Sequence, residues 1–332
     1  MKIACLISSL QLGGAERQIL ALRDFLCAEG HEVTLLTYRD KTFYDSEHVN
    51  LGGGKGLIRR IASYMKESGS EIMISFLPGP STKACIAHML YPKFRLIVSE
   101  RNFNTWMSPK LWLRLVLFQF GADVITCNSY AQKSFISKRF PSLKKKLAKV
   151  SNFIDTDVFH PGEEHPAKGS ILAAGRICRR KNVLGLIKAT AILKRQTKNI
   201  RIDWYGSVKS GRYMKKCLKL IRKYGLEENL RILPATKNIA EIYWKYAIFC
   251  LPSFTEGTSN SLCEAVASGL LTVCSNVSDN PLYSDITFNP HSPKDIANKL
   301  QKALELSENE NIAIKRERIT SICCSNLWSD VL

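Results

Sequence analysis

The sequence has no long hydrophobic run: no window approaches the 18 or so apolar residues that a membrane-spanning helix needs. Internal repeats and low-complexity tracts are also absent, and 45% apolar with 23% charged residues is ordinary for a folded protein. The N-terminal MKIACLISSLQLGG contains an apolar run too short for the core of a signal peptide. We therefore expect a cytoplasmic globular protein, and read this stretch as a first strand.

Paired cysteines with metal-ligand spacing are missing. The eleven cysteines are scattered singly through apolar contexts, and only Cys323 and Cys324 are adjacent. Free, buried thiols in a reducing compartment are the expected state of most of them. We expect neither a metal site nor a disulfide framework.

A dinucleotide fingerprint is missing as well. Gly13 and Gly14 lie between the first expected strand and the first expected helix, but they lack the Gly-x-Gly-x-x-Gly spacing. A dehydrogenase is therefore disfavoured. Two adjacent glycines still allow the backbone to approach a phosphate closely, although Gly-Gly alone is a weak signal.

Acidic residues are scarce relative to basic ones. The chain has 48 Lys and Arg against 29 Asp and Glu, a net charge of +19, and both halves share the excess, with +9 in residues 1–160 and +10 in the remainder. Such a charge suits nucleic acid, anionic lipid headgroups or phosphorylated small molecules. A solvated basic surface without a specific partner is the alternative.

What is present is an alternation of short β-branched runs with segments of helical period. It starts with KIACLISS, GAERQILALRDFLCAEG and EVTLLTY, and begins afresh at SILAAGR after a polar stretch near residues 155–168. We predict an α/β protein of two doubly wound, Rossmann-like domains, 1–160 and 161–332, facing one another across a cleft. The charged final 30 residues are expected to be helical, and Trp328 could pack on either domain.

The stretch PSFTEGTSNSLCEAVASGLLTVCS, residues 252–275, contains two glutamates in a segment otherwise suited to a core. We place Glu256 in a loop at the carboxyl end of a strand and Glu264 on the following helix, where eight positions cover about 12 Å. That is roughly the reach of a nucleotide-sugar, whose diphosphate suits the helix N-terminus between them, at about Thr258 to Ser261. The plain alternative is a capping box from Ser261 to Glu264.

A second stretch, AGRICRRKN, ends a strand at Gly175 and offers Arg176 and Lys181 at the start of the next helix. Fixed cations there would neutralise the charge that develops on a departing diphosphate. Arg179 and Arg180 are interpreted as solvated surface.

Together these elements resemble glycosyltransferase family 4, retaining transferases with the GT-B fold, and the resemblance covers nearly the whole chain. The matching elements, in family order, are GGAER (13–17), VSERN (98–102), NSYAQKSF (128–135), SNFIDTDVFHP (151–161), AGRICRRKN (174–182) and PSFTEGTSNSLCEA (252–265). The last is the most specific.

The resemblance implies a role for each site residue. Glu264 would hold the ribose hydroxyls and Glu256 would lie by the donor sugar, while Arg176 and Lys181 would grip the diphosphate and the Gly13 and Gly14 loop would close over it. The remaining nucleotide-sugar contacts would come from the loop and helix start at Gly257, Thr258, Ser259, Asn260 and Ser261. In this family a leaving phosphate oxygen accepts the acceptor's proton, and neither cofactor nor metal is needed.

The chain departs from the family pattern in two places. Glu100, Arg101 and Asn102 stand where many relatives carry a histidine near the acceptor. Arg101 is expected to serve the site, and a buried ion pair between Arg101 and Glu100 is the alternative. After VCSNV (273–277) the sequence SDNPLYSD stands where the family often has a glycine-rich turn and a further glutamate.

Residues 106–120 mix Trp106, Trp112 and other apolar side chains with Lys110 and Arg114, and Lys144–Lys146 add a basic cluster. A core helix and an interfacial membrane helix both have this composition. Because the family's acceptors are often lipid-linked, we expect peripheral association with the inner face of the plasma membrane.

The leading hypothesis is thus a hexosyltransferase that moves a hexose or N-acetylhexosamine from a UDP-sugar to a lipid-linked or polysaccharide acceptor during synthesis of O-antigen, capsule or lipopolysaccharide. A nucleotide-sugar epimerase of the same fold is one alternative. A basic nucleic-acid-binding protein is another, although the sequence contains no recognisable nucleic-acid-binding module.

Overall fold

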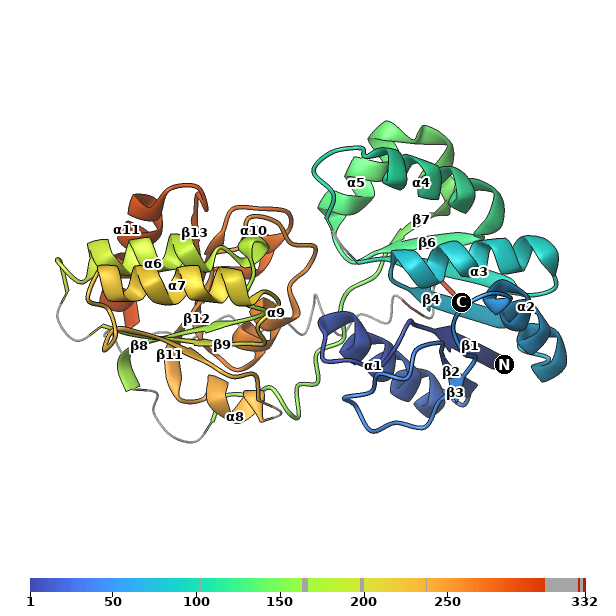
Figure 1. Cartoon of the computed structure of the whole chain (residues 1–332), viewed down its shortest axis with the longest axis horizontal. Coiled ribbons are helices and arrows are strands. Elements are labelled where there is room, and N and C mark those ends of the chain that lie inside the picture. The colour runs from blue at the N-terminus through green and yellow to red at the C-terminus, as the bar shows by residue number, and fades with distance from the viewer. Residues whose placement is uncertain (102, 163–166, 198–199, 237, 308–327, 329–330) are drawn as a thin grey trace. The chain divides into compact units, whose positions relative to one another are not determined.

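The computed structural model describes residues 1–101, 103–162, 167–197, 200–236, 238–307, 328 and 331–332, with the side chain of Lys168 left out of the description. It divides the chain into two compact units (Figure 1). The first comprises Met1–Phe153 with the C-terminal Asn326–Leu332, and the second Ile154–Ser325. Each unit is an α/β layer structure with its own parallel sheet.

The first unit is built on a seven-stranded sheet in the order β3-β2-β1-β4-β5-β6-β7. Its strands are β1 (Lys2–Leu6), β2 (Glu32–Thr37), β3 (Val49–Asn50), β4 (Ile72–Phe76), β5 (Arg95–Glu100), β6 (Val124–Cys127) and β7 (Leu147–Lys149). Its helices are α1 (Gly14–Ala28), α2 (Leu57–Ser68), α3 (Pro78–Leu90), α4 (Pro109–Gly121) and α5 (Tyr130–Arg139), with the 3-10 helix η1 (Pro141–Lys146). The central strands read as continuous hydrophobic runs because helices cover both faces.

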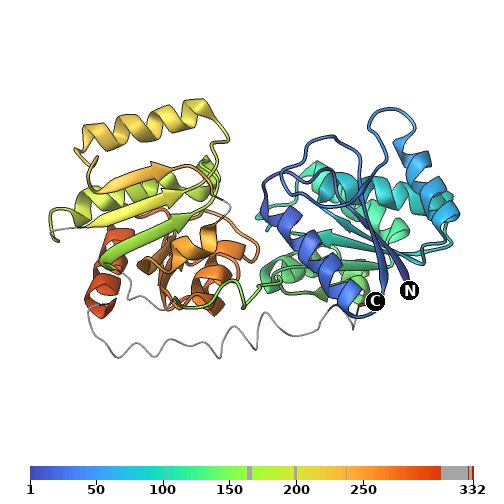
Figure 2. The same cartoon turned by 90° about the horizontal axis from the view of Figure 1, so that it is seen from below.

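The second unit repeats the plan with six strands in the order β10-β9-β8-β11-β12-β13. They are β8 (Ala167–Ala174), β9 (Arg201–Tyr205), β10 (Leu230–Leu233), β11 (Tyr246–Leu251), β12 (Leu271–Ser275) and β13 (Ile286–Phe288). The helices are η2 (Arg179–Lys181), α6 (Val183–Leu193), α7 (Gly211–Lys223), α8 (Ile239–Tyr243), α9 (Asn260–Ala267), α10 (Asn280–Tyr283) and α11 (Pro293–Ser307). Helices α6, α7 and α11 pack on one face, and α8 and α9 on the other (labelled in Figure 1; Figure 2 gives the view turned by 90°).

The predicted fold class is confirmed: both sheets are parallel and doubly wound. In each, the strand order reverses beside the first strand, between β1 and β4 in one unit and between β8 and β11 in the other. Ligands of such folds bind at the carboxyl ends of the strands at this switch point. The sequence did not reveal the edge strands β3, β7 and β13, which are only two or three residues long.

The C-terminal part of the chain contributes to the first unit. Trp328 is buried and its ring stacks on Phe76 of β4, with 6.1 Å between centroids, beside the core residues of α1. Most of the charged helix expected at the C-terminus falls on residues 308–327, which lie outside the described residues. No described helix is both long and apolar enough to cross a bilayer.

Candidate functional site

Two loops meet at the switch point of the second unit. One joins β8 to α6, the other joins β11 to α9, and their strands are neighbours in the sheet. The amide of Phe254 in the second loop donates to the carbonyl oxygen of Arg180 in the first at 2.9 Å. The two stretches that the sequence singled out are therefore joined backbone to backbone at the carboxyl end of the sheet.

The centre of this junction is an ion pair between Lys181 and Glu256. Lys181 Nζ lies 2.7 Å from Glu256 Oε1, and both side chains are about nine-tenths buried. Burial alone would raise the pKa of Glu256, but the charges of Lys181 and Arg180 together with hydrogen bonding to the carboxylate hold the pKa below its usual value. Glu256 is thus a buried carboxylate that stays ionised at neutral pH.

Gly175 makes room for Lys181. It adopts φ +145°, and a Cβ there would lie 3.1 Å from the Cε of Lys181, so the lysine stem passes directly over the glycine. Gly206 of the adjacent strand end has a Cβ position 1.9 Å from the Gly175 carbonyl oxygen, which excludes any side chain. Glycine at both positions lets the backbone and the lysine occupy the same narrow space.

Asn182, the residue after Lys181, holds three loops together. Its Nδ2 donates to the carbonyl oxygens of Pro252 and Pro290, at 3.0 and 2.8 Å, and its Oδ1 accepts from Gly185 N at the start of α6. Its left-handed backbone, φ +57°, is tolerated by asparagine better than by most residues. One buried amide thereby sets the spacing of the loops that carry Lys181 and Glu256.

Glu264 lies on α9, with its carboxylate almost completely buried. The hydroxyl of Tyr243, from α8, lies 3.2 Å from Glu264 Oε2 and 3.0 Å from the carbonyl oxygen of Ser261. The capping-box alternative is wrong, because the helix is capped by Ser259 without a side-chain cap bond and begins at Asn260. Glu264 therefore contacts a tyrosine from another element.

The polar residues before α9 are turned inward. Gly257, Thr258 and Ser259 are buried, whereas Asn260 and Ser261 are half-buried. The first backbone bond of the helix runs from Cys263 N to Ser259 O. The helix N-terminus thus lies within the predicted range of Thr258 to Ser261, and its amides carry the partial positive charge of a helix N-terminus.

In the first unit, Gly13 caps α1 and Gly14 begins it, directly after the β1 loop. Gly13 has extended backbone, so its need for glycine is one of space: a Cβ would lie 2.1 Å from Glu16 Oε2. Glu16 therefore folds back over Gly13, and a phosphate could approach Gly13 only if the Glu16 carboxylate turned away.

Arg101 follows β5 at the same edge of the first sheet. Its guanidinium lies 4.7 Å from the ring centroid of Phe76 and donates to Asn152 Oδ1 at 2.5 Å. Burial lowers the pKa of Arg101 to about 9, which leaves it charged at neutral pH. The pairing of Arg101 with Glu100, offered as an alternative, is wrong. Asn102 lies outside the described residues.

Glu100 is paired with Arg114 of α4 instead. Arg114 Nε lies 2.8 Å from Glu100 Oε1, and its Nη2 donates to Oε2 at 3.0 Å. Burial raises the pKa of Glu100, and Arg114 opposes this without cancelling it. The geometric reason for the error is that Arg101 turns towards Phe76 and Asn152, whereas α4 packs its arginine onto the strand end.

Three residues of the second unit's site were missed. Arg180 was interpreted as solvated surface, yet its charge acts on Glu256. Asn182 and Tyr243 were not considered, because their contacts come from loops and helices far along the chain. An available signal was the asparagine directly before a helix, where it suits an N-cap. Arg176 itself is exposed at the start of the β8–α6 loop.

The predicted site residues thus fall into two sets, one in each unit. Gly13, Gly14 and Arg101 lie at the carboxyl edge of the first sheet. The second unit holds Arg176, Lys181, Glu256, Gly257, Thr258, Ser259, Asn260, Ser261 and Glu264. Among these, side-chain contacts are seen between Lys181 and Glu256 and between the hydroxyls of Ser259 and Ser261.

Comparison with known families assigns both units. Residues 12–158 match the model of Glycosyltransferase Family 4, and residues 158–320 match Glycosyl transferases group 1. The two matches together run over nearly the entire chain and include each predicted site residue.

Individual relatives agree with these matches. Over 286 residues the chain is 29% identical to a Campylobacter jejuni GalNAc-alpha-(1->4)-GalNAc-alpha-(1->3)-diNAcBac-PP-undecaprenol alpha-1,4-N-acetyl-D-galactosaminyltransferase, covering 80% of this chain and 77% of that one. A glycosyltransferase from Rickettsia africae has the same fold, with a TM-score of 0.83 at 14% identity over 99% and 96% of the two chains. Anabaena Alr3699/HepE, solved in complex with UDP, has a TM-score of 0.78 at 15% identity over 100% and 97%.

Proposed function

We propose, from the premise that this chain belongs to the group 1, family 4 glycosyltransferases with the GT-B fold, that it transfers an N-acetylhexosamine from a UDP-sugar to a lipid-linked saccharide. The anomeric configuration is retained in the proposed reaction. The product would be an intermediate of a bacterial surface polysaccharide or glycan. Because the family and this relative are glycosyltransferases, we do not propose the nucleic-acid-binding alternative.

The observation that carries the proposal is the ionised Lys181–Glu256 pair at the switch point of the second sheet. Breaking the bond between sugar and diphosphate places negative charge on the diphosphate and positive charge on the anomeric carbon. Lys181, with Arg180 and Arg176 in the same loop, would stabilise the first, and Glu256 the second. Because the charges are fixed before substrate binds, little reorganisation is needed at the transition state.

The donor's nucleotide is assigned to α9 and the loop before it. The helix N-terminus suits the diphosphate, and the Glu264 carboxylate suits the two ribose hydroxyls as an acceptor of hydrogen bonds. UDP is proposed because the solved Anabaena protein binds it and because the Campylobacter relative transfers N-acetylgalactosamine. Gly13 and Gly14 are proposed to contact a phosphate through their backbone, which requires the Glu16 carboxylate to turn away.

The acceptor is assigned to the first unit, and the Campylobacter relative suggests its class, a saccharide on undecaprenyl diphosphate. Arg101 would contact it, since the guanidinium is charged and lies at the carboxyl edge of the sheet against neutral groups. The ring of Phe76 makes a cation–π contact with this guanidinium, which favours its position there.

A membrane surface is proposed as the place where this acceptor is met, because α4 is apolar on both sides. Leu111, Leu115 and Phe118 are buried in the core, while Trp112, Leu113 and Phe120 are exposed on the opposite side, Phe120 to 70%. The sequence offered a core helix or an interfacial helix, and α4 has the side chains for both.

The charge around α4 favours an anionic membrane. Residues 101–154 contain ten Lys and Arg against one acidic residue, Asp123, so +9 of the chain's +19 lies in this segment. The basic helix η1 lies next to α4, with Lys146 Nζ donating to the carbonyl oxygens of Gln119 and Ala122. Exposed aromatic side chains flanked by lysines are the pattern of a surface that lies on anionic lipid.

The nucleotide assignment is tested by calorimetry with UDP, GDP and ADP on the wild type and the Glu264→Ala variant. We expect UDP to bind tightest and the variant to lose at least about tenfold in affinity, because a hydrogen bond to a charged group is worth about 1.5 to 3 kcal/mol. Unchanged UDP affinity in the variant would contradict the assignment. Incubating the UDP-sugar without acceptor separates the transferase from an epimerase, which needs no second substrate.

The membrane assignment is tested by flotation with phosphatidylcholine vesicles, with and without phosphatidylglycerol. The double variant Trp112→Ser/Phe120→Ser is expected to lose about tenfold or more in binding to anionic vesicles, since burying each side chain contributes about 1.5 to 3 kcal/mol. Leu218→Ser is the matched control, because Leu218 is also exposed on a basic helix, α7. Equal losses in both variants would remove α4 from the membrane contact.

A further inference from the structure

Tyr243 is a completely buried tyrosine whose hydroxyl reaches the first turns of α9 from a different element. Its ring packs against Phe159 and Phe249, with centroids 5.9 and 5.7 Å away. Two aromatic neighbours leave the ring little freedom to rotate. The position of the Tyr243 hydroxyl is thus fixed by the core rather than by α9.

The hydroxyl contacts two acceptors on α9, the carbonyl oxygen of Ser261 and Oε2 of Glu264. A phenol has one hydrogen to donate, so the two acceptors share it. The bond to the carboxylate is charge-assisted, and the surroundings are buried, which strengthens it relative to a bond in water. Tyr243 thereby ties the Glu264 carboxylate to the backbone of the turn below it.

We infer that Tyr243 is a positioning residue for nucleotide recognition: it holds the Glu264 carboxylate at the angle that the ribose diol of the donor requires. The inference rests on the proposed function, in which Glu264 binds the ribose. A carboxylate accepts hydrogen bonds from two neighbouring hydroxyls only when its plane faces both. Tyr243 fixes that plane through Oε2 and, by holding Ser261, the height of the helix turn.

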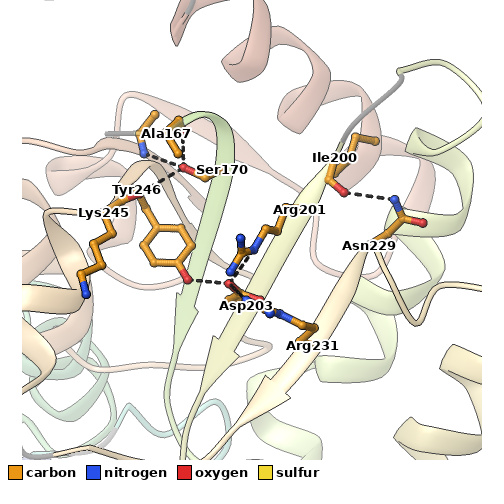
Figure 3. A network of polar contacts seen from close by, with 10 residues as sticks. Ala167, Ser170, Ile200, Arg201, Asp203, Asn229, Arg231, Lys245 and Tyr246 are labelled. Carbon is orange, nitrogen blue, oxygen red and sulfur yellow. Dashed lines mark hydrogen bonds and ion pairs between the residues drawn. The ribbon is translucent and has the colours of Figure 1, made fainter. Parts of the chain in front are cut away.

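A matched control is present in the same unit. Tyr246 also donates its hydroxyl to a buried carboxylate, Oδ2 of Asp203 at 2.5 Å, within a network that includes Arg201 and Arg231 (Figure 3). Asp203 lies on β9, away from the switch-point loops, so removing the Tyr246 hydroxyl tests the cost of the same chemical change without touching Glu264.

The experiment measures binding of the tightest nucleoside diphosphate among UDP, GDP and ADP, together with its 2′-deoxy and 3′-deoxy analogues, by calorimetry. For Tyr243→Phe we expect about tenfold weaker binding of the ribonucleotide and less than about twofold change for the deoxy analogues, because the lost bond acts only through the diol. Tyr246→Phe is expected to lower the thermal midpoint and leave the ratio of ribonucleotide to deoxynucleotide affinity unchanged.

A double variant separates the inference from its premise. In the Glu264→Gln background, Tyr243→Phe is expected to change the ratio no further, since both act on one contact. If Glu264→Gln leaves the ratio unchanged, the assignment of Glu264 to the ribose is overturned, and the role of Tyr243 with it. If Glu264→Gln lowers the ratio but Tyr243→Phe weakens all nucleotides equally or none, Tyr243 is structural only and the inference alone is overturned.

Discussion

Glu100 and Glu256 are two buried glutamates, one in each unit, and each lies 2.7 to 2.8 Å from a cation. Their pKa values nevertheless move in opposite directions, up for Glu100 and down for Glu256. Glu100 faces one arginine, which does not offset the cost of burial, whereas Glu256 has Arg180 in addition to Lys181. The second cation and the hydrogen bonding to Glu256 thus offset its burial, whereas the single arginine beside Glu100 leaves the pKa of that carboxyl raised.

Catalysis should show the largest difference between the two glutamates. Glu256→Gln is expected to lower kcat by about 10²- to 10³-fold, the usual cost of removing one group that stabilises developing charge, with little change in UDP affinity. Glu100→Gln should keep kcat within a few-fold of the wild type, because Glu100 is paired with Arg114 in the first unit's interior. Initial rates of sugar transfer measure kcat for both variants. Equal losses of kcat would contradict a specific catalytic role for Glu256.

The two glutamates should change the pH dependence of the free energy of unfolding in opposite directions. Glu256 has a folded-state pKa below its usual 4.5, so it stabilises the fold above pH 4.5, and this contribution is lost as the pH falls below 4.5 through the folded-state pKa. Glu100 has a folded-state pKa above 4.5, so its contribution is present below pH 4.5 and is lost as the pH rises through that pKa. Each unit of displacement is worth about 1.4 kcal/mol.

Urea unfolding of wild type, Glu256→Gln and Glu100→Gln between pH 4 and 8 measures these contributions. The deficit of Glu256→Gln relative to wild type should stay constant above about pH 4.5 and shrink as the pH is lowered below it, so this series is extended to pH 3, while Glu100→Gln should improve relative to wild type as the pH rises above 4.5. Parallel curves for the two variants would show that the environments of the glutamates are equivalent.

The smallest effect is expected from Arg180→Gln. Removing this charge should let the pKa of Glu256 rise, which shifts the acid limb of the kcat/KM profile to higher pH. A partly exposed charge of this kind is worth about 0.2 to 1 kcal/mol, so kcat/KM on that limb should fall about 1.5- to 5-fold. The neighbouring Arg179 is exposed, and Arg179→Gln should leave the profile in place. A shift with Arg179→Gln as well would point to general surface charge.

The fold was largely predictable because the spacing of apolar residues along a single sequence is enough to recognise alternating strands and helices. The loop positions of Lys181 and Glu256 followed from the same reasoning, since strands that precede a glycine-containing turn end at one edge of a parallel sheet. What escaped prediction were the partners. Glu264 contacts Tyr243 across 21 positions and Glu100 contacts Arg114 across 14, and such pairs depend on how helices pack.

The same limit explains the errors about Arg101 and Ser261. Adjacent residues of opposite charge invite a pairing, but neighbours on an extended backbone point to opposite sides, which separated Glu100 from Arg101. Ser261 has the spacing of a capping box with Glu264, but it is not the N-cap because the helix already begins at Asn260. The local sequence pattern alone does not predict either result, because tertiary contacts determine it.

The stacking of Trp328 on Phe76 has a consequence for how the chain is made. Phe76 belongs to a central strand of the first unit, but its partner is translated only after the whole second unit. At about 5 to 20 residues per second, roughly 10 to 35 seconds separate the synthesis of residue 153 from that of Trp328. During that interval Phe76 has its contact with Arg101 but not the tryptophan that stacks on it in the finished fold, so the core of the first unit is completed only after the second unit has been made.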